Sequence, residues 1–170
     1  MRLRRVVQGV NAAVRIQRER ADHPQVVALL DSLDRYLAAL YPQDANHILS
    51  VGELLAPEVD FFVAWHGERI VGTGAVRRMA GAADTGGRAY GEVKRMFVEP
   101  ALRGQRIGER LLDALESSLR ARQIGLALLE TGRDQREAVR LYERCGYARR
   151  ASFGGYPDNG LSLFMSKALA

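Results

Sequence analysis

Hydrophobic residues recur along this chain with two different periods. From Pro24 to Leu40 they return every three or four positions, which is the period of a helix buried on one face, and proline suits its first turn. The same spacing follows the segment RGQRIG as far as Arg122 and returns in RDQREAVRLYERCGY (133–147). A shorter helical segment is expected near 50–55. The pattern therefore predicts about four helices.

Between these helices lie short apolar runs that are typical of strands. The run GLALLE (125–130) is apolar on both faces and follows the strand YGEVKRMFV (90–98) and a helix, which is the pattern of a parallel pair joined by a right-handed crossover. We therefore predict an α/β (α+β) domain, with a mixed, mostly antiparallel sheet of about seven strands and one central parallel pair. The other expected strands cover 14–18, a hairpin within 60–76, 147–152 and 161–167.

Length and composition fit one domain and restrict its class. A chain of 170 residues with 47% hydrophobic content can form one core, so residues 1–170 are expected to be a single domain. Charged residues interrupt every apolar run, which excludes a membrane-spanning helix. The start lacks a signal-peptide pattern, and the single cysteine, Cys145, suits a reducing compartment; both favour a cytoplasmic protein.

The net charge of +5 is concentrated at the start of the chain. A basic extension over residues 1–12 could be a nucleic-acid arm, but it lacks interleaved aromatic residues and a known binding motif. A solvated leader is the reading we favour. The arginines of the first twenty residues are Arg2, Arg4, Arg5, Arg15, Arg18 and Arg20, against one acid, Glu19.

The segment RGQRIG (103–108) stands where a strand passes into a helix. Free N–H groups and the positive end of the dipole make a helix N-terminus an anion site, and Gly104 and Gly108 would let the backbone approach a ligand. Arg103 and Arg106 add positive charge. A turn with two glycines also occurs for conformational reasons alone. The segment matches neither GxxxxGK[ST] nor GxGxxG, so nucleoside triphosphates and dinucleotides are not favoured.

VKRMFVEPALRGQRIGERLL resembles the acetyl-CoA-binding motif of the GNAT superfamily of N-acetyltransferases. That motif reads Gln or Arg, two residues, Gly, one residue, Gly or Ala; here Arg106 replaces its middle glycine. The resemblance extends over about 60–167 and implies direct transfer of an acetyl group from acetyl-CoA to an amine, without a metal. It implies that the cofactor is bound by Met96, Phe97, Val98, Arg103, Gly104, Gln105, Arg106, Ile107 and Gly108.

A second segment, EAVRLYERCGY, resembles the other signature of this family through Ala138, Tyr142, Gly146 and Tyr147. The resemblance implies that Tyr142 gives a proton to the departing thiolate. Helical spacing also allows another interpretation, because Ala138, Tyr142 and Cys145 fall on one face and Tyr142 could be a core residue with a satisfied hydroxyl. Cys145 has no histidine partner that would favour a nucleophile.

Glu92 is the candidate base. A carboxylate in an apolar strand is costly unless it is paired or functional, and family members often carry a glutamate here that takes the amine's proton. Strand alternation places Glu92, Lys94 and Met96 on one face, so Lys94 could form a structural ion pair with Glu92. A bulge, which the family often has in this strand, would change that phase.

The acceptor site is less well defined by the sequence. The loop LYPQDANH lies where the family's acceptor pocket is often bordered, so Tyr41 and His47 are candidate contacts, and Tyr156 in FGGYPDNG is a third. Both loops could equally be plain polar turns. The histidines are scattered without metal-binding spacing. An acyl-CoA-binding module without turnover is the alternative function, the oligomeric state stays open with a homodimer included, and the acceptor is expected to be a small-molecule or peptide amine.

Overall fold

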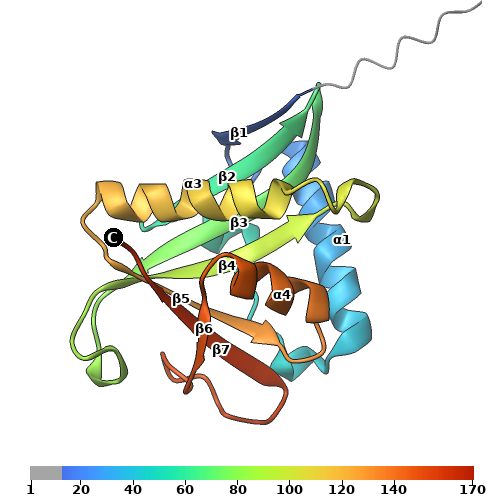
Figure 1. Cartoon of the computed structure of the whole chain (residues 1–170). Helices are drawn as coiled ribbons and strands as arrows, with labels where there is room; N and C mark the ends of the chain where they lie inside the picture. The colour runs from blue at the N-terminus through green and yellow to red at the C-terminus, as the bar shows by residue number, and fades with distance from the viewer. Residues whose placement is uncertain (1–12) are drawn as a thin grey trace, which may run out of the picture.

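The computed structural model describes residues 13–170, which form one seven-stranded sheet in the order β1-β2-β3-β4-β5-β7-β6 (Figure 1). All neighbouring strands are antiparallel except β4 and β5, which are parallel. This confirms the predicted sheet. The predicted basic extension, 1–12, lies outside the described residues. The strands are β1 (Val14–Arg18), β2 (Val59–His66), β3 (Arg69–Met79), β4 (Tyr90–Val98), β5 (Leu126–Gly132), β6 (Ala148–Arg150) and β7 (Ser162–Ala168).

Four α-helices cover the two faces of the sheet, as the hydrophobic period predicted. They are α1 (Pro24–Leu40), α2 (Val51–Leu54), α3 (Ile107–Ala121) and α4 (Arg136–Arg144). Figure 1 shows α3 and α4 on the near face and α1 behind the sheet. Short 3-10 turns cover Gln43–Ala45, Ala83–Thr85 and Pro100–Leu102.

Each face of the sheet has its own core. On the α3 face, Leu112, Leu115 and Leu119 pack with Tyr142 of α4 and Val93 of β4. On the α1 face, the buried apolar residues of α1 and α2 pack against β2 and β3. Burying apolar side chains stabilises the fold by roughly 25 cal/mol per Å² removed from water. The sheet is therefore held rigidly from both sides, including the strands β4 and β5 that border the candidate site.

Strands β4 and β5 pair over only three residues and then diverge. Their register joins Gly91–Val93 to Ala127–Leu129, and Figure 1 shows the two strands separating beyond it, with α4 beside the opening. Because the parallel ladder ends at Val93, the following backbone groups of β4 on that edge have no strand partner in the described chain. The gap between the strands can therefore admit a ligand.

A bulge in β4 changes which residues share a face. Arg95 has a positive φ of 58°, and the pairing with β3 shifts register between Thr73 and Ala75. Simple alternation would put Met96 beside Glu92 and Lys94, but Met96 packs on the other face, with the α3 core. That expectation is corrected by the bulge, because one extra residue reverses the facing of all that follow.

Two interactions hold the bulge in place. The Thr73 hydroxyl donates to the carbonyl oxygen of Arg95 at 2.9 Å. The Arg95 side chain, only 5% exposed, donates from Nη1 to Asp34 Oδ1 of α1 at 2.5 Å. A left-handed backbone costs roughly 1–2 kcal/mol for a residue with a Cβ. The ion pair offsets that cost and ties α1 to β4 at the edge of the gap.

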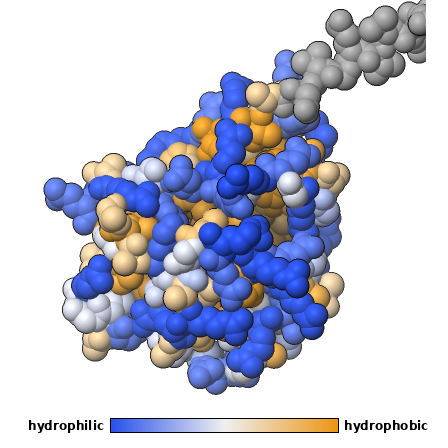
Figure 2. All heavy atoms as spheres, in the orientation of Figure 1, coloured by the Kyte–Doolittle hydropathy of each residue, from blue (hydrophilic) through white to orange (hydrophobic). Residues whose placement is uncertain are grey.

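Polar and charged residues cover most of the face in Figure 2, and apolar residues show only in small patches between them. No helix in residues 13–170 is both long and apolar enough to span a bilayer. The same residues contain no cluster of three or more His, Cys, Asp or Glu side chains suited to a metal ion.

Candidate active site

A long groove runs beside the gap between β4 and β5, with a volume of about 850 Å³. We call it the outer groove. It is bordered by the end of β4, the RGQRIG turn, the start of α3 and the outer side of α4. Of the residues predicted to bind the cofactor, those that line it are Met96, Phe97, Val98, Arg103, Gly104, Arg106, Ile107 and Gly108; Gln105 is not among them.

The RGQRIG turn explains why the family motif favours glycine at its centre. Gly104 has φ 81° and Arg106 has φ 62°, so both adopt the left-handed conformation. The structure thus places a strained arginine where the family motif has glycine. Arg106 is the N-cap of α3, and no side chain caps the helix there. The first N–H groups of α3 are left for a ligand.

The outer groove carries an excess of positive charge. Five arginines and three carboxylates line it: Arg103, Arg106, Arg136, Arg140 and Arg144 against Glu109, Asp134 and Glu137. Some of these charges already pair. Arg103 Nη1 lies 3.1 Å from Glu137 Oε2, and Arg106 Nε lies 2.8 Å from Glu109 Oε2. The remaining positive charge and the helix N-terminus suit a ligand with phosphate groups.

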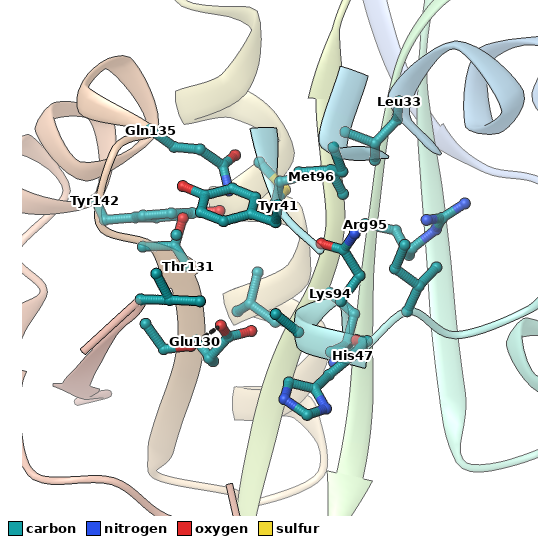
Figure 3. A pocket seen from close by; sticks show the side chains of 18 residues that line it. Leu33, Tyr41, His47, Lys94, Arg95, Met96, Glu130, Thr131, Gln135 and Tyr142 are labelled. Carbon is teal, nitrogen blue, oxygen red and sulfur yellow. Dashed lines mark hydrogen bonds between the residues drawn. The ribbon is translucent and has the colours of Figure 1, made fainter. Parts of the chain in front are cut away.

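A second, smaller cavity of about 100 Å³ lies deeper between the diverging strands. We call it the inner pocket. Residues from α1, the loop 41–48, β4 and the end of β5 line it, and Figure 3 shows their side chains converging from both sides. The outer groove and the inner pocket share Leu33, Met96, Gln135 and Tyr142. A long ligand in the groove and a small ligand in the pocket would therefore meet at these residues.

Tyr142 stands at this junction. It is 6% exposed, and its ring packs edge-on against Tyr147 with 5.8 Å between ring centroids. Burial raises the pKa of its hydroxyl above the ordinary value of 10, and the nearby charge of Glu130 adds to the effect. The hydroxyl is therefore protonated at neutral pH. The sequence left a core role and a catalytic role open, and the residue is in fact both buried in the α3 core and part of both cavities.

Glu92 belongs to a buried polar cluster, and its own side chain lines neither cavity. It is 5% exposed, and Tyr156 donates a short hydrogen bond from its hydroxyl to Glu92 Oε1. Lys94 Nζ lies 3.5 Å from the same oxygen, and donates to Tyr156 Oη at 2.9 Å and to the carbonyl oxygen of His47 at 2.8 Å. The predicted ion pair with Lys94 is present. Lys94 itself lines the inner pocket, so it separates Glu92 from that pocket.

The three predicted acceptor contacts lie in one region but not equally close to the pocket. Tyr41 and His47 line the inner pocket, whereas Tyr156 lies behind it, edge-on to the His47 ring at 4.9 Å between centroids. Tyr41 is 8% exposed, and its hydroxyl accepts a hydrogen bond from the N–H of Asp134 at 3.2 Å. Burial raises the pKa of Tyr41. The hydrogen bond from Asp134 to Tyr41 ties the segment before α4 to the loop 41–48.

Tyr41 fits only because residue 132 is glycine. A Cβ at Gly132 would lie 2.0 Å from Tyr41 Oη and 2.3 Å from Cζ. We expect Gly132→Ala to lower the free energy of unfolding by about 2 kcal/mol, as overpacking does in a rigid site, measured by urea denaturation. Gly52→Ala, whose Cβ would meet nothing nearer than 3.9 Å, is the matched control and should cost nothing. Recovery of stability in Gly132→Ala combined with Tyr41→Ala would confirm the clash; equal losses in G132A and G52A would refute it.

Three features of the site were not anticipated from the sequence. Glu130 and Gln135 line the inner pocket, and the pair of Asp34 and Arg95 borders it. Glu130 carried a usable signal, because it is a lone acid at the end of an apolar strand, the same feature that drew attention to Glu92. Asp34 carried none, since acidic residues on a helix surface are common.

Comparison with known proteins agrees with this geometry. Residues 57–149 match the model of the acetyltransferase (GNAT) domain. An IAA acetyltransferase from Azospirillum brasilense is 46% identical over 156 residues, covering 92% of this chain and 98% of that protein. The structure of a candidate acyl-CoA N-acyltransferase from Klebsiella pneumoniae is 32% identical, with a TM-score of 0.76 over 94% of this chain and 100% of that one.

A more distant structure shares the fold. The PaiA N-acetyltransferase from Thermoplasma acidophilum, solved in complex with coenzyme A, is 16% identical with a TM-score of 0.70, over 92% of this chain and 99% of that one. The family match, together with the diverging parallel pair and the basic turn at its opening, identifies an acyl-CoA-dependent transferase. The chain belongs to the GNAT acetyltransferase family, and it is an N-acetyltransferase that uses acetyl-CoA as its co-substrate.

Proposed function

We propose that the outer groove binds acetyl-CoA, that the inner pocket binds the amine of a small molecule, and that the acetyl group passes directly from one to the other. The observation that carries this proposal is the junction of the two cavities at Met96 and Tyr142. Holding both substrates there makes the transfer effectively unimolecular. A peptide amine fits the pocket less well than a small amine, because the cavity is only about 100 Å³.

The cofactor's phosphates would be bound by the RGQRIG turn. The uncapped N–H groups at the start of α3 and the side chains of Arg103 and Arg106 supply donors and positive charge. Met96, Phe97 and Val98 follow the point where β4 loses its partner strand, so their backbone N–H groups are candidates to hold the pantetheine chain and polarise the thioester carbonyl.

Tyr142 would protonate the thiolate as it leaves. The amine nitrogen attacks the thioester carbonyl carbon, the carbon–sulfur bond breaks, and the Tyr142 hydroxyl gives its proton to sulfur. The attacking nitrogen loses a proton as it becomes the amide nitrogen, and that proton can restore the Tyr142 phenol. The raised pKa of Tyr142 keeps its hydroxyl protonated at neutral pH.

The assignment of Glu92 as base stays a prediction. Its carboxylate is joined to Tyr156 and Lys94, and Lys94 stands between it and the inner pocket. A proton would have to reach Glu92 through Lys94, Tyr156 or a water molecule. A structural role, in which Glu92 holds Lys94 and Tyr156 in place, needs no such transfer.

The relative named IAA acetyltransferase makes IAA a compound to include in any acceptor screen. A cytoplasmic location is supported by the single, half-buried Cys145, since burial raises the pKa of its thiol and a free thiol suits a reducing compartment.

The test of this function is isothermal titration of the full chain with acetyl-CoA, coenzyme A, NAD and ATP, followed by an amine screen with detection of released thiol. Saturable binding of acetyl-CoA and coenzyme A alone, with thiol release that depends on an amine, is the expected result. Binding of coenzyme A without turnover of any acceptor would favour the alternative, an acyl-CoA-binding module. Binding of neither would remove the proposal.

Arg103→Ala is expected to weaken coenzyme A binding about tenfold, or about 1.4 kcal/mol, because it removes a charge-assisted contact to phosphate. The loss should shrink as salt is raised from 50 to about 500 mM, since screening weakens the contact in the unmodified protein. Arg149→Ala removes an exposed arginine of β6 and is the matched control. Equal dissociation constants for the two variants would show that Arg103 does not contact the cofactor.

A further inference from the structure

The inner pocket contains one carboxylate among its described lining residues, that of Glu130 near the end of β5. Figure 3 shows it on the same side of the pocket as Thr131 and Tyr142. On the neighbouring strand β7, Ser162 donates from Oγ to Glu130 Oε1 at 2.7 Å. No described residue donates a hydrogen bond to the other oxygen, Oε2. One oxygen is therefore anchored and the other is left for a ligand.

The cations of the pocket do not neutralise Glu130. Lys94 Nζ donates hydrogen bonds to the carbonyl oxygen of His47 and to Tyr156 Oη, and it pairs with Glu92. It forms no ion pair with Glu130. Arg95 is paired with Asp34. Each of these cations has its own carboxylate, so among the lining Lys, Arg and Glu side chains only Glu130 has no ionic partner within residues 13–170. A half-buried carboxylate without a counter-charge favours a cationic ligand.

Apolar side chains cover one part of the pocket wall, and polar side chains such as Asn46, Thr131 and Gln135 cover much of the rest. Leucines from α1 and from the segment before β7 line it, and Leu161 is 38% exposed at its edge. An apolar surface of this kind gains free energy when it covers an apolar ligand. The apolar lining residues are Leu33, Leu37, Ala45, Ile48, Val93, Met96 and Leu161.

We propose that Glu130 binds the amino group of the acceptor as an ammonium ion, and that the acceptor is a small primary monoamine with an apolar body. This inference rests on the proposed function. Glu130 Oε2 would accept a hydrogen bond from the ammonium group and hold its nitrogen beside Tyr142, where the outer groove opens. One proton would then pass from the ammonium to the Glu130 carboxylate, which frees the nitrogen lone pair for attack on the thioester. Leu37, Ile48 and Leu161 would cover the apolar part. An acceptor with a carboxylate next to its amine would be repelled by Glu130.

The experiment compares acceptors and variants in the same thiol-release assay. The acceptors are 2-phenylethylamine, ethanolamine, phenylalanine and IAA; the variants are Glu130→Gln, Glu92→Gln and Glu143→Gln. We expect 2-phenylethylamine to have the highest kcat/KM, and E130Q to raise its KM at least tenfold. Glutamine keeps the acceptor for Ser162 but removes the charge, so the fold should survive. Glu143 lies at the surface beside Arg149 and serves as the control.

Two further measurements separate a binding role from a structural one. Coenzyme A affinity and the thermal midpoint of E130Q should match the unmodified protein, and Glu130→Asp should recover part of the KM because it restores the charge. A raised KM with E92Q but not with E130Q would overturn the proposal in favour of Glu92. Turnover of IAA or phenylalanine in preference to 2-phenylethylamine, or of no acceptor while coenzyme A still binds, would also overturn it. Failure to bind coenzyme A would instead refute the proposed function itself.

Discussion

Replacing Tyr142 with phenylalanine is expected to lower kcat about 100-fold, the usual size of a positioned proton donor's contribution. The substitution removes only a hydroxyl, and the ring that packs with the α3 core remains. Coenzyme A should therefore bind with an unchanged dissociation constant, measured by titration calorimetry. Without a proton, the departing sulfur leaves as a thiolate, which is why the loss is expected in kcat.

The matched control for this variant is Tyr147→Phe. Tyr147 is 3% exposed and packs against Tyr142, but it lines neither cavity. Removing its hydroxyl should leave kcat within about twofold of the unmodified enzyme, since it contacts no substrate. Equal losses in both variants would mean that general damage to the core, and not proton transfer, accounts for the effect.

The raised pKa of Tyr142 also has a consequence for pH. The protonated phenol is the form that acts, and burial moves its pKa above the ordinary value of 10. Loss of activity from this group would therefore begin only at a higher pH than for an exposed tyrosine. The pH dependence of kcat in the unmodified enzyme should show no decline from Tyr142 between pH 7 and about 10.

Asp34→Ala is expected to lower the free energy of unfolding by about 2 kcal/mol, because it leaves the buried guanidinium of Arg95 without its counter-charge. Arg95 is the buried partner, with 5% of its side chain exposed, whereas Asp34 is 42% exposed. The Nε atom of Arg95 already lacks a hydrogen-bond partner within the described structure, so the loss of Asp34 would leave the Arg95 guanidinium poorly satisfied. Urea denaturation measures the loss.

Asp31→Ala is the control for this prediction, because Asp31 is exposed on the same helix. It should change the free energy of unfolding by less than about 0.5 kcal/mol. A loss below about 1 kcal/mol in Asp34→Ala would show that water replaces the carboxylate at little cost, and that the bulge of β4 does not depend on this pair.

The sequence predicted the fold well because local patterns determine most of it. The helical period of Pro24–Leu40 and the apolar run at 125–130 indicate burial on one face and on two faces, and these properties are local. The RGQRIG turn was likewise found from its residues and its place between a strand and a helix. The left-handed Arg106 explains afterwards why that position favours glycine in the family.

The inner pocket was harder to predict, because it depends on contacts between distant segments. The bulge at Arg95 is held by Asp34 and Thr73, which lie 61 and 22 residues away in sequence. No local pattern indicates such a bulge, so Met96 was expected on the wrong face. Glu92 and Glu130 look alike in sequence, as acids in apolar strands. Only the three-dimensional arrangement separates the one that is enclosed by Lys94 and Tyr156 from the one that lines the pocket.

The most direct test of this account is the initial-rate pattern when acetyl-CoA and 2-phenylethylamine are varied together. Two cavities that meet at Tyr142 require both substrates to be bound at once, so double-reciprocal plots should give intersecting lines. Parallel lines would indicate that the acetyl group first moves to the protein and that coenzyme A leaves before the amine enters. That result would contradict direct transfer between the outer groove and the inner pocket.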